Sequence, residues 1–84
     1  MKFLIYSSLL CPYCDAAKGL LKKLKLDYSE ILIDNDPMVK KQMIKLSKRN
    51  TVPQIFFGNR HIGGYDDLYS LNKEGKILNL INEK

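Results

Sequence analysis

The sequence predicts a small α/β domain in which a four-stranded mixed sheet is flanked by helices. Apolar stretches of strand length alternate with segments of helical periodicity along the chain. Gly58-Asn59 separates the last two strand-like stretches and predicts a two-residue hairpin turn. The resulting order, β-α-β-α-β-β-α, joins a strand–helix–strand unit to an antiparallel pair. A chain of 84 residues can form one core, so we expect a single domain over residues 1–84.

The first half of the chain supplies two strands and the first helix. Lys2–Ser7 is apolar with aromatic residues, which predicts a buried strand, and Ser7–Leu10 follows as a loop. From Pro12 onward, apolar residues recur at helical spacing and define one inward face: Ala17, Leu20, Leu21 and Leu24. Tyr28–Ile33 is then predicted as the second strand.

A second helix is predicted over residues 37–48. Asp36 suits the N-cap, and Pro37 suits the first helical position, where its missing N–H leaves no bond unmade. Basic residues near the end of this helix, including Arg49 just beyond it, suit the negative end of the helix dipole. The expected inward face consists of Val39, Met43 and Leu46.

A hairpin and two short helices are predicted for the last third of the chain. Gln54–Phe57 and Arg60–Ile62 are the two strands of the hairpin, and Gly63-Gly64 ends the second strand. Either Asp66 or Asp67 can cap the helix that follows. Apolar residues of these last helices are expected to face inward: Leu68, Leu71, Ile77, Leu78 and Ile81.

The only two cysteines, Cys11 and Cys14, are spaced C-x-x-C at a predicted strand-to-helix junction. This arrangement is typical of a thiol–disulfide redox site. The thiolate is the form that attacks a disulfide, and the unpaired N–H groups and dipole of a helix N-terminus favour an anion at Cys11. The two cysteines are therefore the candidate catalytic pair.

A zinc site or a chance pairing would account less well for the two cysteines. A structural zinc site needs four ligands, usually Cys or His, and outside the pair the chain offers only His61. We therefore predict no metal, and we interpret His61 as structural. Cysteines that are close by chance would more often lie inside an element as small hydrophobic residues, rather than at a helix start with Pro12 between them.

Composition and charge exclude several classes of partner. The formal net charge is +5, but half of the fourteen basic residues lie on the two predicted lysine-rich helices, where a solvated face is the simpler interpretation. Nucleic-acid binding would require interleaved aromatic residues or a docking module, and neither is present. No apolar run is long enough to span a bilayer, and residues 3–10 fit a strand and loop better than a signal peptide. We therefore expect a cytoplasmic protein that binds neither nucleic acid nor membrane.

Three motifs together resemble the dithiol glutaredoxins of the short bacterial type: Cys11-Pro12-Tyr13-Cys14, Thr51-Val52-Pro53 and Gly63-Gly64-Tyr65-Asp66. The resemblance covers essentially the whole chain. It implies a thioredoxin-like (glutaredoxin) fold with the cysteine pair at the start of the first helix. It also implies reduction of glutathione mixed disulfides and protein disulfides, with glutathione as reductant and no bound cofactor.

The resemblance implies roles for individual residues. Cys11 is the nucleophile that forms a mixed disulfide with glutathione, and Cys14 resolves it. Val52, held by a cis Pro53, offers its backbone to the cysteinyl unit of glutathione. The implied substrate-binding residues are Tyr13, Arg49, Thr51, Val52, Pro53, Gly64, Tyr65, Asp66 and Asp67. Asp66 and its neighbours would meet the γ-glutamyl end, and Arg49 the glycine carboxylate. From the residues alone, helix capping and a helix-end cation remain alternatives for the aspartates and for Arg49.

The sequence departs from the family just before the first cysteine. Many members have a lysine three residues before it and Ser or Thr directly before it, whereas this chain has Ser8 and Leu10. A cation that would stabilise the thiolate and bind the glycine carboxylate is therefore missing.

Three alternative functions remain open. They are an electron carrier served by thioredoxin reductase, an iron–sulfur protein bridged through Cys11 and glutathione, and a non-catalytic domain. Pro12 and Cys14 oppose the cluster, since related cluster binders usually have glycine after the first cysteine and lack the second. We expect a monomer, with ribonucleotide reductase as a family-level substrate.

Overall fold

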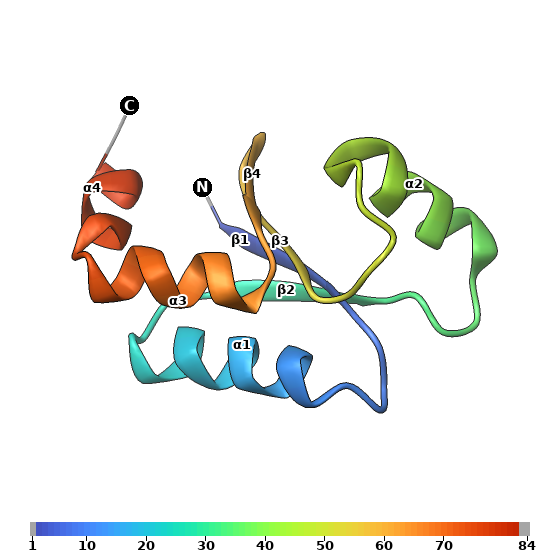
Figure 1. Ribbon diagram of the computed structural model, residues 1–84, viewed down its shortest axis with the longest axis horizontal. Helices are drawn as coiled ribbons and strands as arrows, with labels where there is room; N and C mark the ends of the chain where they lie inside the picture. The colour runs from blue at the N-terminus through green and yellow to red at the C-terminus, as the bar shows by residue number, and fades with distance from the viewer. Residues whose placement is uncertain (1, 83–84) are drawn as a thin grey trace.

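The computed structural model describes residues 2–82. Its elements follow the predicted order β-α-β-α-β-β-α, and the last apolar segment forms a separate helix at the end (Figure 1). The four strands and four helices are β1 (Phe3–Ser7), α1 (Pro12–Lys23), β2 (Tyr28–Leu32), α2 (Pro37–Ser47), β3 (Gln54–Phe57), β4 (Arg60–Gly63), α3 (Tyr65–Lys73) and α4 (Lys76–Asn82). The strands form one mixed sheet with the order β2-β1-β3-β4. The predicted α/β fold class, a four-stranded mixed sheet flanked by helices, is therefore confirmed.

The sheet is built outward from β1 at its centre. β1 pairs in parallel with β2, and α1 forms the crossover that a parallel pair requires. On its other side, β1 pairs antiparallel with β3, with Ile5 opposite Ile55. β3 turns back into β4 through Gly58-Asn59, where Gly58 has a left-handed backbone (φ 61°) that suits glycine.

Alternating residues of the central strands pack into two hydrophobic layers. Phe3 and Ile5 of β1 face a core that α1, α3 and α4 complete with Leu21, Leu68 and other apolar side chains. Tyr6 faces the opposite side of the sheet, where the core includes Met43 of α2 and Phe56 of β3. The two-residue side-chain period of a strand thus places α2 on one face of the sheet and the other helices on the opposite face (Figure 1).

Two of the predicted inward-facing leucines are exposed instead. Leu46 of α2 is 51% exposed and Leu78 of α4 is 67% exposed, so these two predictions are wrong. In α2 the buried line runs through Met43 and Ser47, which are four residues apart, and Leu46 lies beside this line. In α4 the buried residues are Ile77 and Leu80. The apolar pattern of these short helices did not fix which face meets the sheet.

Several predicted boundaries differ by one residue. β1 begins at Phe3 rather than Lys2, β2 ends before Ile33, and β4 extends to Gly63. α2 ends at Ser47, because Lys48 adopts a left-handed backbone (φ 62°) that terminates the helix. At the start of this helix, the Asp36 carboxylate accepts hydrogen bonds from two backbone N–H groups, as its predicted N-cap role requires.

Candidate active site

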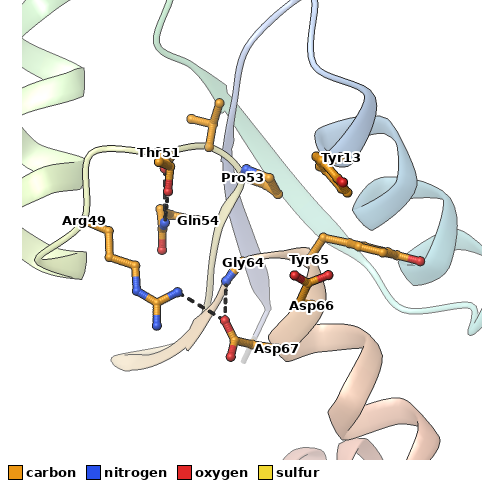
Figure 2. A pocket seen from close by; sticks show the side chains of 10 residues that line it. Tyr13, Arg49, Thr51, Pro53, Gln54, Gly64, Tyr65, Asp66 and Asp67 are labelled. Atoms are coloured by element: carbon orange, nitrogen blue, oxygen red, sulfur yellow. Dashed lines mark hydrogen bonds and ion pairs between the residues drawn. The ribbon is translucent and has the colours of Figure 1, made fainter.

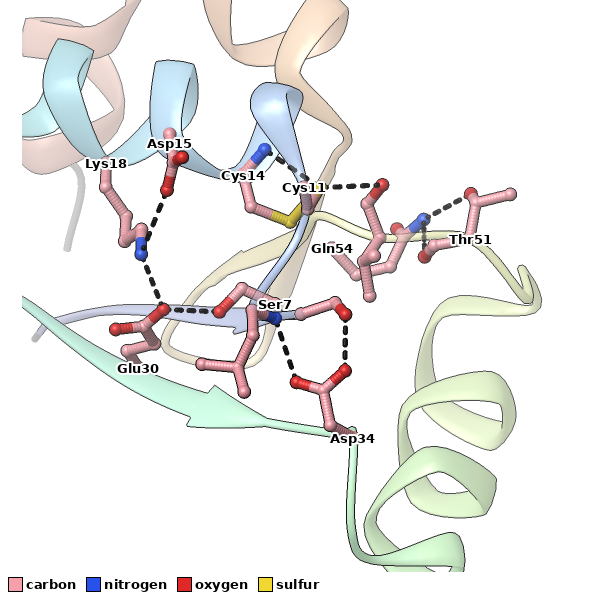
Figure 3. Close-up of a disulfide and its surroundings, with 12 residues drawn as sticks. Ser7, Cys11, Cys14, Asp15, Lys18, Glu30, Asp34, Thr51 and Gln54 are labelled. Carbon is pink, nitrogen blue, oxygen red and sulfur yellow. Dashed lines mark hydrogen bonds and ion pairs between the residues drawn. A yellow bond between two sulfur atoms is a disulfide. The ribbon is translucent and has the colours of Figure 1, made fainter.

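Cys11 and Cys14 lie at the N-terminus of α1 and form a disulfide (Figure 3). Cys11 is the N-cap residue, and its sulfur accepts a hydrogen bond from the Cys14 backbone N–H at 3.1 Å. Cys14 is fully buried, whereas Cys11 is partly exposed. In the reduced protein the backbone N–H groups of this first turn favour a thiolate at position 11, and only this sulfur is open to a substrate.

A polar network fastens the active-site helix to the sheet. Lys18 of α1 donates to the Glu30 carboxylate of β2 at 2.8 Å, and the buried Ser7 hydroxyl at the end of β1 donates to the same carboxylate. The Lys18 ammonium and then the Ser7 hydroxyl lower the pKa of Glu30, although partial burial opposes them. Figure 3 shows these groups beneath the first turns of α1, where they hold the helix that positions the cysteines.

The loop between α2 and β3 brings the Thr51-Val52-Pro53 motif to the cysteine pair. The Val52–Pro53 peptide bond is cis, as the family resemblance implies. The carbonyl oxygen of Val52 lies 3.9 Å from the Cys11 sulfur. The backbone of this loop therefore runs directly beside the reactive sulfur, with polar backbone groups available to a ligand.

All nine predicted substrate-binding residues line one open pocket of about 220 Å³ (Figure 2). Tyr13 comes from α1, a second group from the α2–β3 loop, and a third from the start of α3. The sequence separates these groups by up to about fifty residues, and the sheet brings them together because β3 lies beside β1. Their grouping agrees with the expected site, and their individual roles remain predictions.

Asp67 organises the charged side of the pocket. Its carboxylate accepts a hydrogen bond from the Gly64 backbone N–H at 2.9 Å and pairs with the Arg49 guanidinium at 3.1 Å. The Gly64 N–H is the main cause that lowers the pKa of Asp67, and Arg49 adds to it. Asp67 therefore caps α3 from its third position, whereas Asp66 is exposed beside it. Asp67 thus both caps the helix and lines the pocket, so the two interpretations of this residue are compatible.

The pocket has one lining residue that the sequence did not reveal, Gln54. Its buried amide donates to the Thr51 carbonyl and hydroxyl oxygens at 3.1 and 3.3 Å, and its oxygen lies 2.8 Å from His61 Nε2. The sequence did contain a signal for this role, because Gln54 is a polar residue at the start of an otherwise apolar strand. A buried amide needs hydrogen-bond partners, and such partners gather at a site. His61 packs against Phe56, and burial lowers the pKa of its imidazole.

Ser8, which stands where many family members have a lysine, bonds to another part of the chain and not to the pocket. Its hydroxyl donates to the Asp34 carboxylate, and Ser8 does not line the pocket.

Among residues 2–82, no three His, Cys, Asp or Glu side chains are grouped so as to hold a metal ion. None of the helices in the same part of the chain is long and apolar enough to cross a membrane.

Known proteins are similar to this chain over most of its length. A glutaredoxin family model matches residues 3–62. Glutaredoxin 3 of Escherichia coli K12 is 48% identical over 73 residues, which cover 87% of this chain and 88% of that protein. Glutaredoxin 1 of Rickettsia bellii is 49% identical over 82 residues, covering 93% and 84%.

Solved structures lead to the same family. The glutaredoxin of Brucella melitensis superposes with a TM-score of 0.84 at 44% identity, covering 95% of this chain and 87% of that one. A buckwheat glutaredoxin–glutathione complex superposes with a TM-score of 0.83 at 28% identity, covering 90% and 72%. These similarities confirm the thioredoxin-like fold. With a redox-capable Cys11–Cys14 pair at the start of α1, the chain belongs to the glutaredoxin family and is a dithiol thiol–disulfide oxidoreductase.

Proposed function

We propose that this protein reduces glutathione mixed disulfides and protein disulfides with glutathione as the electron donor. The observation that supports this most directly is the pocket beside Cys11, which combines one guanidinium, two carboxylates and the backbone of the Thr51-Val52-Pro53 loop. Glutathione carries a glycine carboxylate, an ammonium group and a peptide backbone, and the pocket offers a guanidinium, a carboxylate and backbone groups that suit these three in turn. The buckwheat relative was solved as a glutathione complex.

In the proposed complex, each part of glutathione meets a different segment of the pocket. The glycine carboxylate binds Arg49, whose guanidinium is already oriented by Asp67. The exposed Asp66 carboxylate receives the γ-glutamyl ammonium group. The cysteinyl unit pairs with the backbone of Val52, which places its sulfur next to the Cys11 sulfur. Tyr13 flanks this position, with its ring centroid 6.2 Å from that of Tyr65.

The proposed reaction is two successive thiol–disulfide exchanges. The Cys11 thiolate attacks the glutathione sulfur of a mixed disulfide, a Cys11–glutathione bond forms, and the substrate leaves as a thiolate that takes a proton from water. A second glutathione thiolate then attacks the glutathione sulfur on Cys11. This step releases the Cys11 thiolate and glutathione disulfide, one half of which came from the substrate and the other from the donor. The substrate is thus reduced, and one free glutathione molecule is consumed for each mixed disulfide.

Stabilising the Cys11 thiolate helps the second exchange more than the first. A thiol of ordinary acidity is only about 3% ionised at neutral pH, so stabilisation can increase the thiolate population roughly 30-fold. Nucleophilicity falls with basicity, with a slope of about 0.4–0.5, and this offsets most of the gain. A stabilised thiolate is the better leaving group, so the helix N-terminus chiefly speeds the release of Cys11 from glutathione.

For protein disulfides, Cys14 provides the second step. After Cys11 attacks, the Cys14 thiolate attacks the Cys11 sulfur, closes the disulfide and releases the reduced substrate. Two glutathione molecules then reopen the pair. Ribonucleotide reductase is one proposed substrate of this route, and we propose that the protein acts as a cytoplasmic monomer.

The proposal is tested by glutathione-dependent reduction of a small glutathione mixed disulfide, followed through glutathione reductase. We expect the wild type and Cys14→Ser to be active and Cys11→Ser to be inactive. If the wild type turns over only with thioredoxin reductase, glutathione is not the donor. If both donors fail and the anaerobically purified protein shows a visible absorbance band, the iron–sulfur alternative replaces the proposal.

A further inference from the structure

The turn that precedes Cys11 in the chain exposes two leucines. Leu9 is 65% exposed and Leu10, directly before the nucleophile, is 96% exposed. Neither residue lines the pocket that we assign to glutathione. Tyr13, on the other side of Cys11 in the chain, is also exposed, at 64%, but it belongs to the pocket. The two residues directly before Cys11 are therefore apolar, open to solvent and outside the pocket.

This turn is held in place by a residue from another part of the chain. Asp34, in the connection between β2 and α2, accepts a hydrogen bond from the Leu9 backbone N–H at 2.8 Å and another from the Ser8 hydroxyl (Figure 3). The two oxygens of one carboxylate thus fix two successive residues. A surface that is already ordered loses less conformational entropy when a partner binds than a flexible loop does.

We propose that Leu9 and Leu10, held by Asp34, form a docking surface for peptide segments of disulfide substrates. The surface selects substrates whose reactive cysteine has apolar neighbours. This inference rests on the proposed reduction of protein disulfides at Cys11. It concerns the protein substrate, whereas the pocket, which neither leucine lines, is assigned to glutathione.

The geometry of the mixed disulfide determines what lies on this surface. When a substrate cysteine is bonded to Cys11, the two Cα atoms are about 5.5–6 Å apart. The residues next to the substrate cysteine are about 3.8 Å further along its chain, so they come within side-chain reach of Leu10 and Leu9. Apolar neighbours would bury leucine surface, whereas polar neighbours would be desolvated without a partner. A second copy seated here would cover Cys11, which must stay open for turnover.

The test uses two peptides that differ only next to their cysteines. Each peptide is closed by one internal disulfide, with leucine beside both cysteines in one and serine in the other. The pre-reduced protein reduces them in a single turnover, which needs no external donor, and rates are normalised to those with dithiothreitol. We expect the wild type to favour the leucine peptide roughly tenfold, since partial burial of two leucines has an effect of that order.

Variants separate docking from chemistry. The double variant Leu9→Ser/Leu10→Thr should reduce both peptides at nearly equal rates, and Asp34→Ala should lower the preference. Leu78→Ser is the matched control, because Leu78 is 67% exposed on α4, and it should keep the wild-type preference. Turnover of a small glutathione mixed disulfide should stay within about twofold in the double variant, since no peptide segment is buried there.

Each outcome counts for or against the docking surface or the glutathione site. Equal rates on the two peptides in the wild type, or a preference that survives the double variant, would overturn the docking surface. Loss of turnover with the small glutathione mixed disulfide in the wild type would count instead against glutathione as donor. Sedimentation of both proteins completes the test: if the wild type dimerises and the double variant is monomeric, the leucines bind a second copy and the inference is wrong.

Discussion

Replacing Asp67 with alanine should destabilise the protein by about 1–2 kcal/mol. The carboxylate makes two separate contacts, one with the Gly64 N–H that begins α3 and one with Arg49. Loss of a helix-capping group costs about 1 kcal/mol. The ion pair adds about 0.2–1 kcal/mol, because both side chains are roughly half exposed, at 49% and 46%. For a domain of this size, the melting temperature should fall by roughly 5–15 °C.

The pH dependence of this difference has a definite sign. The folded-state pKa of Asp67 is lowered, first by the Gly64 N–H, so the folded protein favours the ionised carboxylate. A lowered carboxyl pKa contributes stability that is complete above the unfolded value and disappears as the pH falls through the folded value. The difference between wild type and Asp67→Ala should therefore be constant near neutral pH and shrink below about pH 4.

Urea unfolding followed by circular dichroism, at pH 7 and near pH 3, measures both effects. Asp66→Ala is the matched control, since both the Gly64 contact and the Arg49 contact belong to Asp67 and not to Asp66. This control substitution should lower the free energy of unfolding by less than about 0.5 kcal/mol. Asp67→Asn keeps an acceptor for the Gly64 N–H and should retain most of the capping contribution. Equal losses for the two alanine variants, or a loss at Asp67 that persists in acid, would refute the reasoning.

Three further predictions concern local structure. Gly63→Ala should cost about 1–3 kcal/mol in urea unfolding, because φ is 122° and the added Cβ would meet the Asp67 carboxylate; an unchanged midpoint would contradict this. Gly19→Ala, with open space around its Cβ, should instead stabilise by about 0.5–1 kcal/mol, and a loss would show an unseen contact. Lys18 and Ser7 lower the pKa of Glu30, so the ionised carboxylate stabilises the folded state, and this contribution should disappear as the pH falls below about 4.5. In urea unfolding at several pH values, Glu30→Gln should therefore lose less stability on acidification than the wild type does.

The features that the sequence determined are those that depend on residues close together in the chain. Asp36 and Pro37 begin a helix because a side-chain acceptor and a missing N–H act within one turn. Gly58-Asn59 forms the hairpin because the turn needs a left-handed backbone at a two-residue connection. The cysteine pair likewise depends only on its place at the start of a helix. Together with the motifs that resemble the family, these local features were enough to predict the fold class and the type of reaction.

Only the tertiary structure decided how distant segments meet. The Arg49–Asp67 pair joins the α2–β3 loop to α3, and the Gln54 amide oxygen meets His61 of the paired strand β4. No pattern within a single helix or strand encodes either contact. Tertiary packing also determined that Leu46 and Leu78 are exposed. A short helix with apolar residues on several sides can bury only one of them, and the face that packs best against the sheet is the one that becomes buried. The sequence thus supplies the reactive groups and their local conformations, whereas strand pairing and packing determine which of them share a pocket and which leucines remain at the surface.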